Sequence, residues 1–411
     1  MFLRLAISSL WNRRGSALLT FLAITVSVFV LLGVEQIRQQ TKDNFGNTVS
    51  GIDLIVGART GDINLLLYSV FRLGHATNNI SWESYQQIAT NPNVAWTIPI
   101  ILGDSHKGYR VMGTTEDYFK HFRFGQAQPL TFLEGVPFSG NFDVVLGSEV
   151  ARSLNYQLDD QLILSHGVGS TSFSRHDNNP FQIVGILKPT GTPVDQTLHV
   201  SVDGIEAIHI GGQNGRPSLS NSDAAREGIT PKTLTAFMVG LNSKLAIFRL
   251  QRQINNYRAE PLLSILPGVT LMQLWQMMAV MENTLRLIAA LVLLASLLGL
   301  AAMLLASIRE RQREIGIMRT IGASPWFLLA LIEVEALLIT LAAVSMALIL
   351  LTVTTALSAD FLAEHFSLFI NASIITVQSV FYLLIVIVSA LILGLIPAIA
   401  AYRGALHQQL T

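Results

Sequence analysis

The sequence predicts a membrane protein with four transmembrane α-helices and a large α+β extracytoplasmic domain between the first and second helices. Three observations support this fold class. The 411 residues are 51% hydrophobic and only 13% charged, which is too apolar for an ordinary soluble protein. Four apolar stretches are long enough to cross a bilayer, which takes about 20 helical residues. Between the first and second lies a segment without such a stretch, of about 250 residues, which can hold a core of its own.

Residues 1–15 are expected to form a short elbow helix in the membrane interface, because apolar side chains recur along one side of it. The first span, 16–34, carries no charge and follows Arg4, Arg13 and Arg14. An excess of Lys and Arg marks the cytoplasmic end of a span, so the N-terminus is expected in the cytoplasm. A cleaved signal peptide is the alternative, but the apolar run is long and ends without a small-residue cleavage site.

Three further spans are predicted at 287–308, 327–357 and 380–401. The first of these contains nine Leu, two Ile and one Val, which amounts to about −6 kcal/mol of preference for the membrane. The short loop 309–326 joins it to the next span, so the two form a transmembrane hairpin. Residues 358–379 include acidic residues but no Lys or Arg, as expected for a periplasmic loop, and residues 402–411 are expected to form a cytoplasmic tail.

The outer domain is expected at 35–286, with helical stalks that continue the first and second spans. A strand, helix, strand pattern occurs at 50–103 and again at 233–271, and two such units predict a split βαβ, ferredoxin-like domain. Its strands are expected at 52–56, 94–102, 234–241 and 262–271, and its helices at 81–90 and 245–257. Residues 104–232 are expected to be a mostly β insert that ends in a loop at 211–232, where Gly, Asn, Ser and Pro are frequent.

The loop 309–326 is expected to contain an amphipathic helix on the cytoplasmic side, because Arg outnumbers Glu in it. Its apolar ridge consists of Ile315, Ile317, Met318, Ile321 and Gly322. Gly322 suits a helix C-cap, Ser324 an N-cap and Pro325 the first position of the next helix, so a sharp turn is expected there. This pattern fits either a plain interfacial loop or a docking helix for a cytosolic partner.

The loop also carries a motif, RQREIGIMRTIGA at 311–323. With the apolar span that follows, it resembles the signature of ABC-transporter permeases of the MacB, LolC and FtsX superfamily. The pieces at 113–119, 145–151 and 183–187 are similar to the periplasmic core domain of MacB-type permeases. In that family a porter subdomain is split by an inserted sabre subdomain. The resemblance implies porter-like segments at 50–103 and 233–271 and a sabre-like insert at 104–232.

In this family the loop is the coupling helix that sits in a groove of the ATPase subunit. The resemblance implies that role for Glu314, Ile315, Gly316, Ile317, Met318, Arg319, Ile321 and Gly322. The chain has no Walker A pattern, so ATP and magnesium are expected in a separate cytosolic ABC ATPase. A second copy or a related permease is the expected membrane partner, and a periplasmic or lipoprotein partner is also compatible. The zero net charge gives no sign of a nucleic-acid partner.

Two intramembrane carboxylates, Glu333 and Glu335, lie near the start of the third span, where a charge is costly. They are either interfacial groups beside the Arg cluster or a polar contact at a dimer seam. The family has a Glu near this point, and either residue fits it. Small residues at one-turn spacing favour close helix packing, which would suit a dimer; these are Ala295 with Gly299 and Ala390 with Gly394.

The sequence contains no cysteine, which excludes disulfides and thiol nucleophiles. The nine His form no tight ligand motif, and no nucleophile, base and orienting group can be recognised. We therefore expect no catalytic residues, no metal site and no cofactor in this chain.

These observations favour the permease subunit of a MacB/LolC-type transporter in the bacterial inner membrane, with both termini cytoplasmic. It would couple ATP hydrolysis by its partner to movement of the periplasmic domain and so handle a substrate in the cell envelope. One alternative is an FtsX-like regulator of a periplasmic cell-wall hydrolase, against which the large outer region argues. Another is a component of a metal-uptake system. No motif specifies the substrate.

Overall fold

The computed structural model describes residues 2–48, 50–166, 180–210, 231–310, 317, 322, 324–366 and 376–407. The chain divides into two units. A helical unit is built from 1–40, 279–360 and 370–411, and an α/β unit is built mainly from 41–278.

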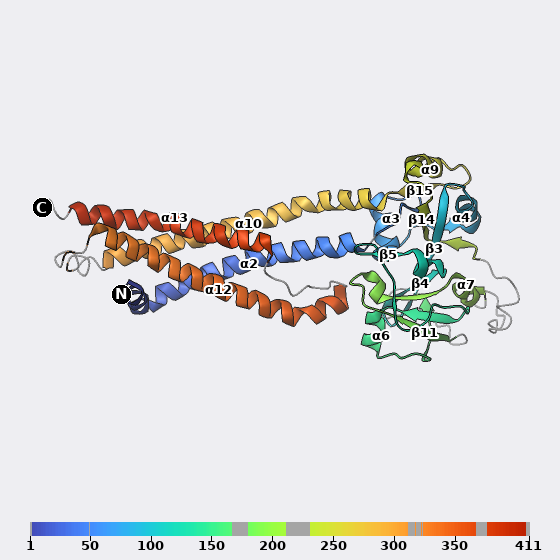
Figure 1. The fold of residues 1–411 in the computed structure, drawn as a ribbon, viewed down its shortest axis with the longest axis horizontal. Helices are drawn as coiled ribbons and strands as arrows, with labels where there is room; N and C mark the ends of the chain where they lie inside the picture. Colours follow the sequence, from blue (N-terminus) through green and yellow to red (C-terminus); the bar gives the residue numbers. More distant parts are fainter. Residues whose placement is uncertain are drawn as a thin grey trace. The chain divides into compact units, whose positions relative to one another are not determined.

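The helical unit contains four long helices that run lengthwise beside one another (Figure 1): α2 (Arg14–Asn47), α10 (Pro267–Glu310), α12 (Pro325–Phe366) and α13 (Val377–His407). Each contains a stretch long and apolar enough to cross a membrane. Large apolar side chains such as Leu294 and Val388 are exposed on the outside of the bundle, as expected where lipid is the solvent. The buried core combines residues of all four helices, among them Ile24, Val28, Leu32, Leu297, Leu300, Ile339, Ala343 and Ala390.

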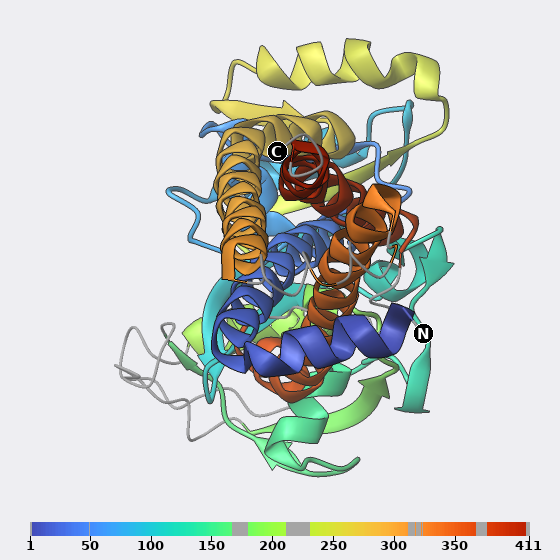
Figure 2. The same ribbon diagram turned by 90° about the vertical axis from the view of Figure 1, so that its left-hand side faces the viewer.

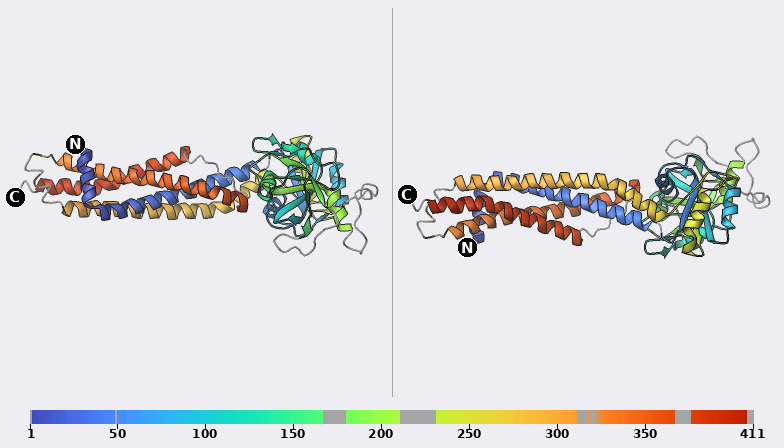
Figure 3. Two further views of the ribbon diagram at one scale, coloured as in Figure 1. Left: turned by 90° about the horizontal axis from the view of Figure 1, so that it is seen from below. Right: turned by 90° about the horizontal axis from the view of Figure 1, so that it is seen from above.

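The N-terminal helix α1 (Phe2–Asn12) lies across the direction of the other helices (Figures 2 and 3). It is separated from α2 by a turn at Arg13. The backbone N–H of Arg13 bonds to the carbonyl of Leu10 at 3.1 Å, and the carbonyl of Arg13 accepts from Ala17 at 3.0 Å. The change of direction therefore costs few backbone hydrogen bonds.

The helices are longer than the predicted spans, and three expectations were wrong for this reason. Residues 358–366, expected in a loop, continue α12, because they contain neither Gly nor Pro and helix propagation needs no apolar surface. Residues 402–407, expected in a tail, continue α13. The expected strand at 262–271 ends at Ile265, since Pro267 occupies the first position of α10, where proline is favoured.

In the described residues of the α/β unit, eleven strands form one sheet. At one end of it the order is β15-β1-β14-β3, with each neighbouring pair antiparallel. The bounds are β1 Leu54–Ala58, β3 Val94–His106, β14 Ala236–Leu241 and β15 Leu262–Ile265. Taken in chain order, these strands lie in the order fourth, first, third, second, which is the order of a split βαβ, ferredoxin-like sheet.

Both faces of these strands are covered. Leu54 and Val56 pack in a cluster with residues of α4 (Trp82–Ala89) and α9 (Ile247–Asn255). Ile55 points to the opposite face and packs with residues of α3 (Asp62–Ser69), because successive strand residues alternate between faces. The Ser81 hydroxyl caps α4 by accepting a hydrogen bond from the backbone of Ser84 at 3.3 Å.

Strand β3 extends beyond this region and pairs with β4 (Tyr109–Thr114) through a tight turn. Lys107 and Gly108 have φ of 46° and 91° in the turn, the left-handed pair that a two-residue hairpin requires. The sheet then continues through β12 (Thr197–Ser201), β8 (Asp143–Leu146), β11 (Phe181–Leu187) and β7 (Phe132–Gly135). In this half β4 and β12 are parallel, as are β8 and β11.

The remaining elements of the α/β unit are short. The helices are α5 Asp117–His121, α6 Ser148–Leu154, α7 Val202–Ile210, η1 Pro193–Gln196 and η2 Lys244–Ala246. The strands are β2 Ile80–Ser81, β5 Arg123–Phe124, β6 Gln128–Pro129, β9 Gln161–Leu162, β10 Ser165–His166 and β13 Thr233–Leu234. Most of the expected loop at 211–232 falls outside the described residues, which resume at residue 231.

A buried polar cluster joins the two halves of the sheet. The guanidinium of Arg72 donates to the carbonyl of Ser69 and approaches the Met112 sulfur. The ring of His199 stacks on Tyr118 with 5.2 Å between centroids. Burial and the charge of Arg72 lower the pKa of His199 to about 3, and burial raises the pKa of Tyr118 to about 12. His199 is therefore neutral in the folded protein at all ordinary pH values.

Candidate functional site: the helix hairpin and its polar contacts

The loop between α10 and α12 lies largely outside the described residues. Ile317 is helical and 59% exposed, and Gly322 has φ of +99°. The coupling role assigned to these two residues stays a prediction. The other residues assigned to the coupling helix lie outside the described residues, and their coupling role is likewise a prediction. These are Glu314, Ile315, Gly316, Met318, Arg319 and Ile321.

The turn after the loop has the predicted local chemistry. The left-handed φ of Gly322 is a conformation that glycine adopts at low cost. The Ser324 hydroxyl accepts a hydrogen bond from the backbone of Phe327 at 3.3 Å, and Pro325 is the first residue of α12. These residues end the loop and start the next helix within four positions, so the third span begins at a defined point.

The residues before the loop are tied to the N-terminus. Arg13 donates a hydrogen bond of 2.7 Å to the carbonyl of Ser307 and lies 3.3 Å from the Glu310 carboxylate. Carbonyl groups at a helix C-terminus lack intrahelical partners, and a cation there is favourable. The turn between α1 and α2 is thereby connected to the end of α10, immediately ahead of the predicted coupling helix.

Glu333 and Glu335 both turn towards packed parts of the helical unit. Glu335 is only 3% exposed. A Cβ on Gly394 of α13 would lie 3.3 Å from both carboxylate oxygens of Glu333, so the glycine allows α13 to approach this carboxylate. One oxygen of Glu333 is buried without a hydrogen-bond partner among the described residues. Neither residue is a freely solvated interfacial carboxylate.

The two pairs of small residues have different surroundings. Ala390 is 1% exposed and Gly394 packs against Glu333 and Ala336 of the same chain. Their packing is thus explained within one copy, and a role of this pair in a dimer stays a prediction. Ala295 and Gly299 are exposed on α10, and nothing lies within 4 Å of a Cβ placed on Gly299. That face of α10 is open to lipid or to another helix.

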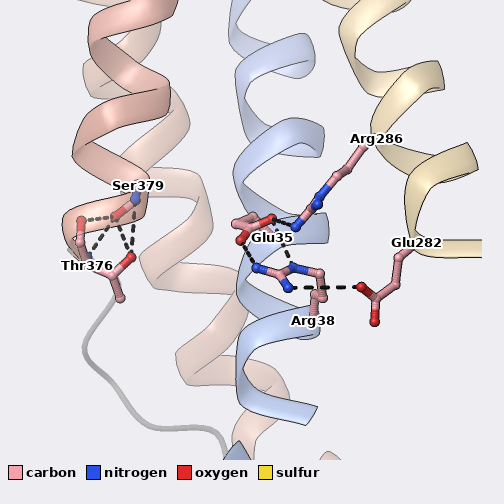
Figure 4. Close-up of polar contacts among 6 residues, drawn as sticks. All are labelled: Glu35, Arg38, Glu282, Arg286, Thr376 and Ser379. Carbon is pink, nitrogen blue, oxygen red and sulfur yellow. Dashed lines mark hydrogen bonds and ion pairs between the residues drawn. The ribbon is translucent and has the colours of Figure 1, made fainter. Parts of the chain in front are cut away.

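An ion cluster joins α2 to α10 at the far end of the spans from the hairpin loop (Figure 4). Glu35 accepts hydrogen bonds from Arg38 on its own helix and, at 3.1 Å, from Arg286 on α10. Arg38 also lies 3.9 Å from Glu282. The side chain of Glu35 is only 8% exposed, and that of Arg38 only 11%. We call these four residues the stalk cluster.

Neutral hydrogen bonds accompany the stalk cluster along the helices. The hydroxyls of Ser27 and Ser296 share a hydrogen bond of 2.7 Å between α2 and α10. Thr25 donates to the carbonyl of Ala343 on α12 at 3.4 Å. Such bonds are worth about 0.6 kcal/mol on average inside a membrane. The stalk cluster and the bond between Ser27 and Ser296 therefore connect α2 to α10 at two levels, and Thr25 connects α2 to α12.

Helix α13 starts with a reciprocal cap that is also drawn in Figure 4. The Ser379 hydroxyl accepts from the backbone of Thr376 at 2.7 Å, and the Thr376 hydroxyl accepts from the backbone of Ser379 at 3.2 Å. Two N–H groups without intrahelical partners are satisfied in this way. The fourth span therefore has a defined beginning.

Sequence reasoning did not find the stalk cluster. The sequence marks Glu35 and Arg286 only as the boundaries of the outer domain. A signal was present, since both residues directly flank the predicted spans 16–34 and 287–308 on the same side of the membrane. Two charges of opposite sign at that depth favour pairing.

The described residues contain no group of three or more His, Asp or Glu side chains that could hold a metal ion. The buried titratable groups of the α/β unit are spread through its core, and His106, for example, contacts the carbonyl of Ile163 at 2.7 Å and the Tyr156 hydroxyl at 2.9 Å. Burial lowers the pKa of His106. These groups stabilise the fold, and the polar contacts with a candidate functional role lie between the long helices.

Comparison with known proteins agrees with this architecture. The model of the MacB-like periplasmic core domain matches residues 17–257, more than half of the chain, and the model of the FtsX-like permease C-terminal region matches residues 286–409. No curated protein sequence matches the chain.

Among solved structures, the periplasmic region of MacB from Actinobacillus actinomycetemcomitans is similar at 11% identity and a TM-score of 0.35, covering 55% of this chain and 94% of that one. The extracellular domain of the noncanonic ABC-type transporter YknZ from Gram-positive bacteria is similar at 12% identity and a TM-score of 0.31, covering 52% and 98%. On the strength of the two family models, the chain belongs to the MacB/FtsX superfamily of ABC-transporter permeases.

Proposed function

We propose that this chain is the permease subunit of a MacB/LolC-type transporter and works as a mechanical transmitter. A separate cytosolic ABC ATPase would bind ATP and magnesium, and the coupling helix at 314–322 would bind in a groove of that ATPase. Its ATP-driven movement would pass along the helices to the periplasmic domain. The substrate would then be handled in the cell envelope rather than carried through a central pore.

The observation that carries this proposal is the length of α2 and α10. They contain 34 and 44 residues, which correspond to about 51 Å and 66 Å of helix. The hydrocarbon core takes only about 30 Å. Each helix therefore continues past the bilayer without a break, and α10 begins directly after β15 of the outer domain. An unbroken helix is stiff enough to carry a displacement from one side of the membrane to the other.

The contacts between α2 and α10 support the same role. The stalk cluster and the bond between Ser27 and Ser296 couple the two helices. Arg13 couples the start of α2 to the end of α10, next to the predicted coupling helix. A force applied at the loop would thus reach both helices together.

We further propose that the termini and the hairpin loop are cytoplasmic, in a bacterial inner membrane, as the positive-inside rule implies. Two copies, or this chain and a related permease, would pair through the exposed face of α10 around Ala295 and Gly299, where small residues allow close approach. A periplasmic or lipoprotein partner would act on the outer domain.

The absence of cysteine from the sequence makes a labelling test direct. A spin label at Val280→Cys, an exposed position on α10, reports the separation of two copies. The purified chain alone should hydrolyse no ATP and show one distance distribution. When a cognate ABC ATPase is added, ATP but not ADP should shift that distribution. ATP turnover by the chain alone, or an ATPase that hydrolyses ATP without any shift, would contradict the proposal.

A further inference from the structure

An apolar groove lies on the helical unit where α1, α2 and α12 meet. Its lining includes Ile7 and Trp11 of α1, Leu18 and Phe21 of α2, and Leu338 and Ala342 of α12. The cavity volume is about 390 Å³, at the small end of the range for ligand pockets. Helix α1, which contributes part of this lining, crosses the bundle instead of running along it (Figures 2 and 3).

A single cation stands among these apolar side chains. Arg14 contributes to the lining and is exposed. Its neighbour Arg13 is engaged by Ser307 and Glu310, whereas Arg14 has no ion-pair partner in the part of the chain that the structure describes. The groove thus combines an apolar floor with one free positive charge.

The position of the groove limits what can occupy it. Leu338 and Ala342 belong to the membrane-crossing stretch Trp326–Ser358 of α12. Trp11 is 74% exposed, and tryptophan is enriched at the level of lipid headgroups. The groove therefore reaches from the headgroup level into the hydrocarbon, where water is not a competing occupant.

We propose that this groove binds one anionic phospholipid, with an acyl chain along Leu18, Phe21 and Ala342 and the phosphate on Arg14. The apolar lining complements the acyl chain, and the unpaired guanidinium complements the headgroup. Arginine suits this role because its fork of donors fits a phosphate. The bound lipid would brace α1 against α2 and α12. The inference does not depend on the proposed transport function.

The test uses the full chain in nanodiscs that contain equal amounts of phosphatidylglycerol and phosphatidylcholine. Lipids that stay bound after transfer to detergent are counted by native mass spectrometry. Wild type should retain one phosphatidylglycerol per chain. Arg14→Gln should reduce its retention about fivefold, the effect of one cation beside an anionic lipid, while Arg14→Lys should retain most of it. Ala342→Trp, which fills the groove, should abolish retention.

The matched control is Val388→Trp, which adds the same bulk at an exposed position of α13 and should leave retention unchanged. Equal retention of the two lipids by wild type would overturn the proposal, as would unchanged phosphatidylglycerol retention in Arg14→Gln or Ala342→Trp. Occupation of the groove by a second copy of the chain would also overturn the proposal. In that case Ala342→Trp would dissociate a dimer without any change in bound lipid.

Discussion

The carboxylate of Glu35 accepts a hydrogen bond of 3.1 Å from the guanidinium of Arg286, 251 positions away along the chain. The side chain of Glu35 is only 8% exposed, whereas that of Arg286 is 36% exposed, so the carboxylate is held largely out of water and the guanidinium is partly solvated. Arg38 completes the set of donors around this carboxylate. The contact joins the two helices that enter and leave the outer domain, and it makes their separation costly.

The first prediction concerns this pair. Removing Glu35 leaves Arg38 and Arg286 without the carboxylate they share, and removing Arg286 leaves this mostly buried carboxylate with Arg38 alone. Glu35→Ala and Arg286→Ala should therefore each destabilise the chain. Because both remove the same contact, the double variant should be less destabilised than the sum of the two. We expect a coupling energy of about 1–3 kcal/mol, measured by denaturant titration in mixed micelles.

The matched control for this cycle is Glu116 with Lys120, a pair 3.7 Å apart whose side chains are 52% and 60% exposed. An exposed helical pair of this kind should give a coupling of about 0.5 kcal/mol or less. Strictly additive effects at Glu35 and Arg286 would show that the stalk cluster does not hold α2 to α10.

The second prediction concerns the hairpin loop and follows from the proposed coupling role. Met318→Asp places a carboxylate on the apolar ridge that would contact the ATPase, where an unpaired charge costs several kcal/mol. Gln312→Asp adds the same charge at a position expected to face solvent. The first variant should lose the ATPase in co-purification and the second should keep it, at matched membrane levels.

Both variants should still insert, because the flanking spans decide insertion. Retention of the ATPase by Met318→Asp at the level of wild type would leave the loop as an interfacial linker only.

The third prediction is the topology. Reporter fusions after Gly322 and after the last helix should be active only with a cytoplasmic reporter, because the Arg residues lie on that side. A fusion within the outer domain, for instance after Gly103, should be active only with a periplasmic reporter. Activity of the periplasmic reporter after Gly322 would reverse the proposed orientation of every span.

The fourth prediction is a pH dependence that arises from His199. Its pKa is about 3 in the folded protein, against about 6.5 in an unfolded chain. Below pH 6.5 the imidazole of His199 therefore binds a proton in the unfolded chain but stays neutral in the folded one. The contribution of His199 to the free energy of unfolding is therefore complete above about pH 6.5 and is lost as the pH falls towards 3. The loss is about 2 kcal/mol at pH 5.

His199→Phe keeps a ring against Tyr118 and removes the titrating group. The difference in unfolding free energy between pH 7.5 and pH 5 should shrink by about 2 kcal/mol in this variant, measured by intrinsic tryptophan fluorescence of the full chain. His75→Phe, at an exposed position, is the control and should leave that difference unchanged. An unaltered pH dependence in His199→Phe would assign the acid sensitivity to other groups.

The membrane architecture could be predicted from the sequence because its determinants are local. An uncharged stretch such as 287–308 partitions into a bilayer wherever it occurs, and Gly322, Ser324 and Pro325 select a turn through their own backbone and side-chain chemistry. The ends of the helices were harder to predict. Hydropathy detects the apolar part of α12, whereas the helix continues to Phe366.

The contacts between elements were decided only by the tertiary structure. Arg13 and Arg14 are identical neighbours in the sequence, yet Arg13 is paired with Glu310, whereas Arg14 lines the groove without an ion-pair partner among the described residues. No local pattern separates them, because the difference arises from the direction in which α1 crosses the bundle. Likewise, the partner of Glu35 is 251 residues away, and β1 lies between β14 and β15 although about 180 residues separate it from β14 along the chain. Local chemistry determines which segments form helices and strands, whereas packing determines which charges meet between them.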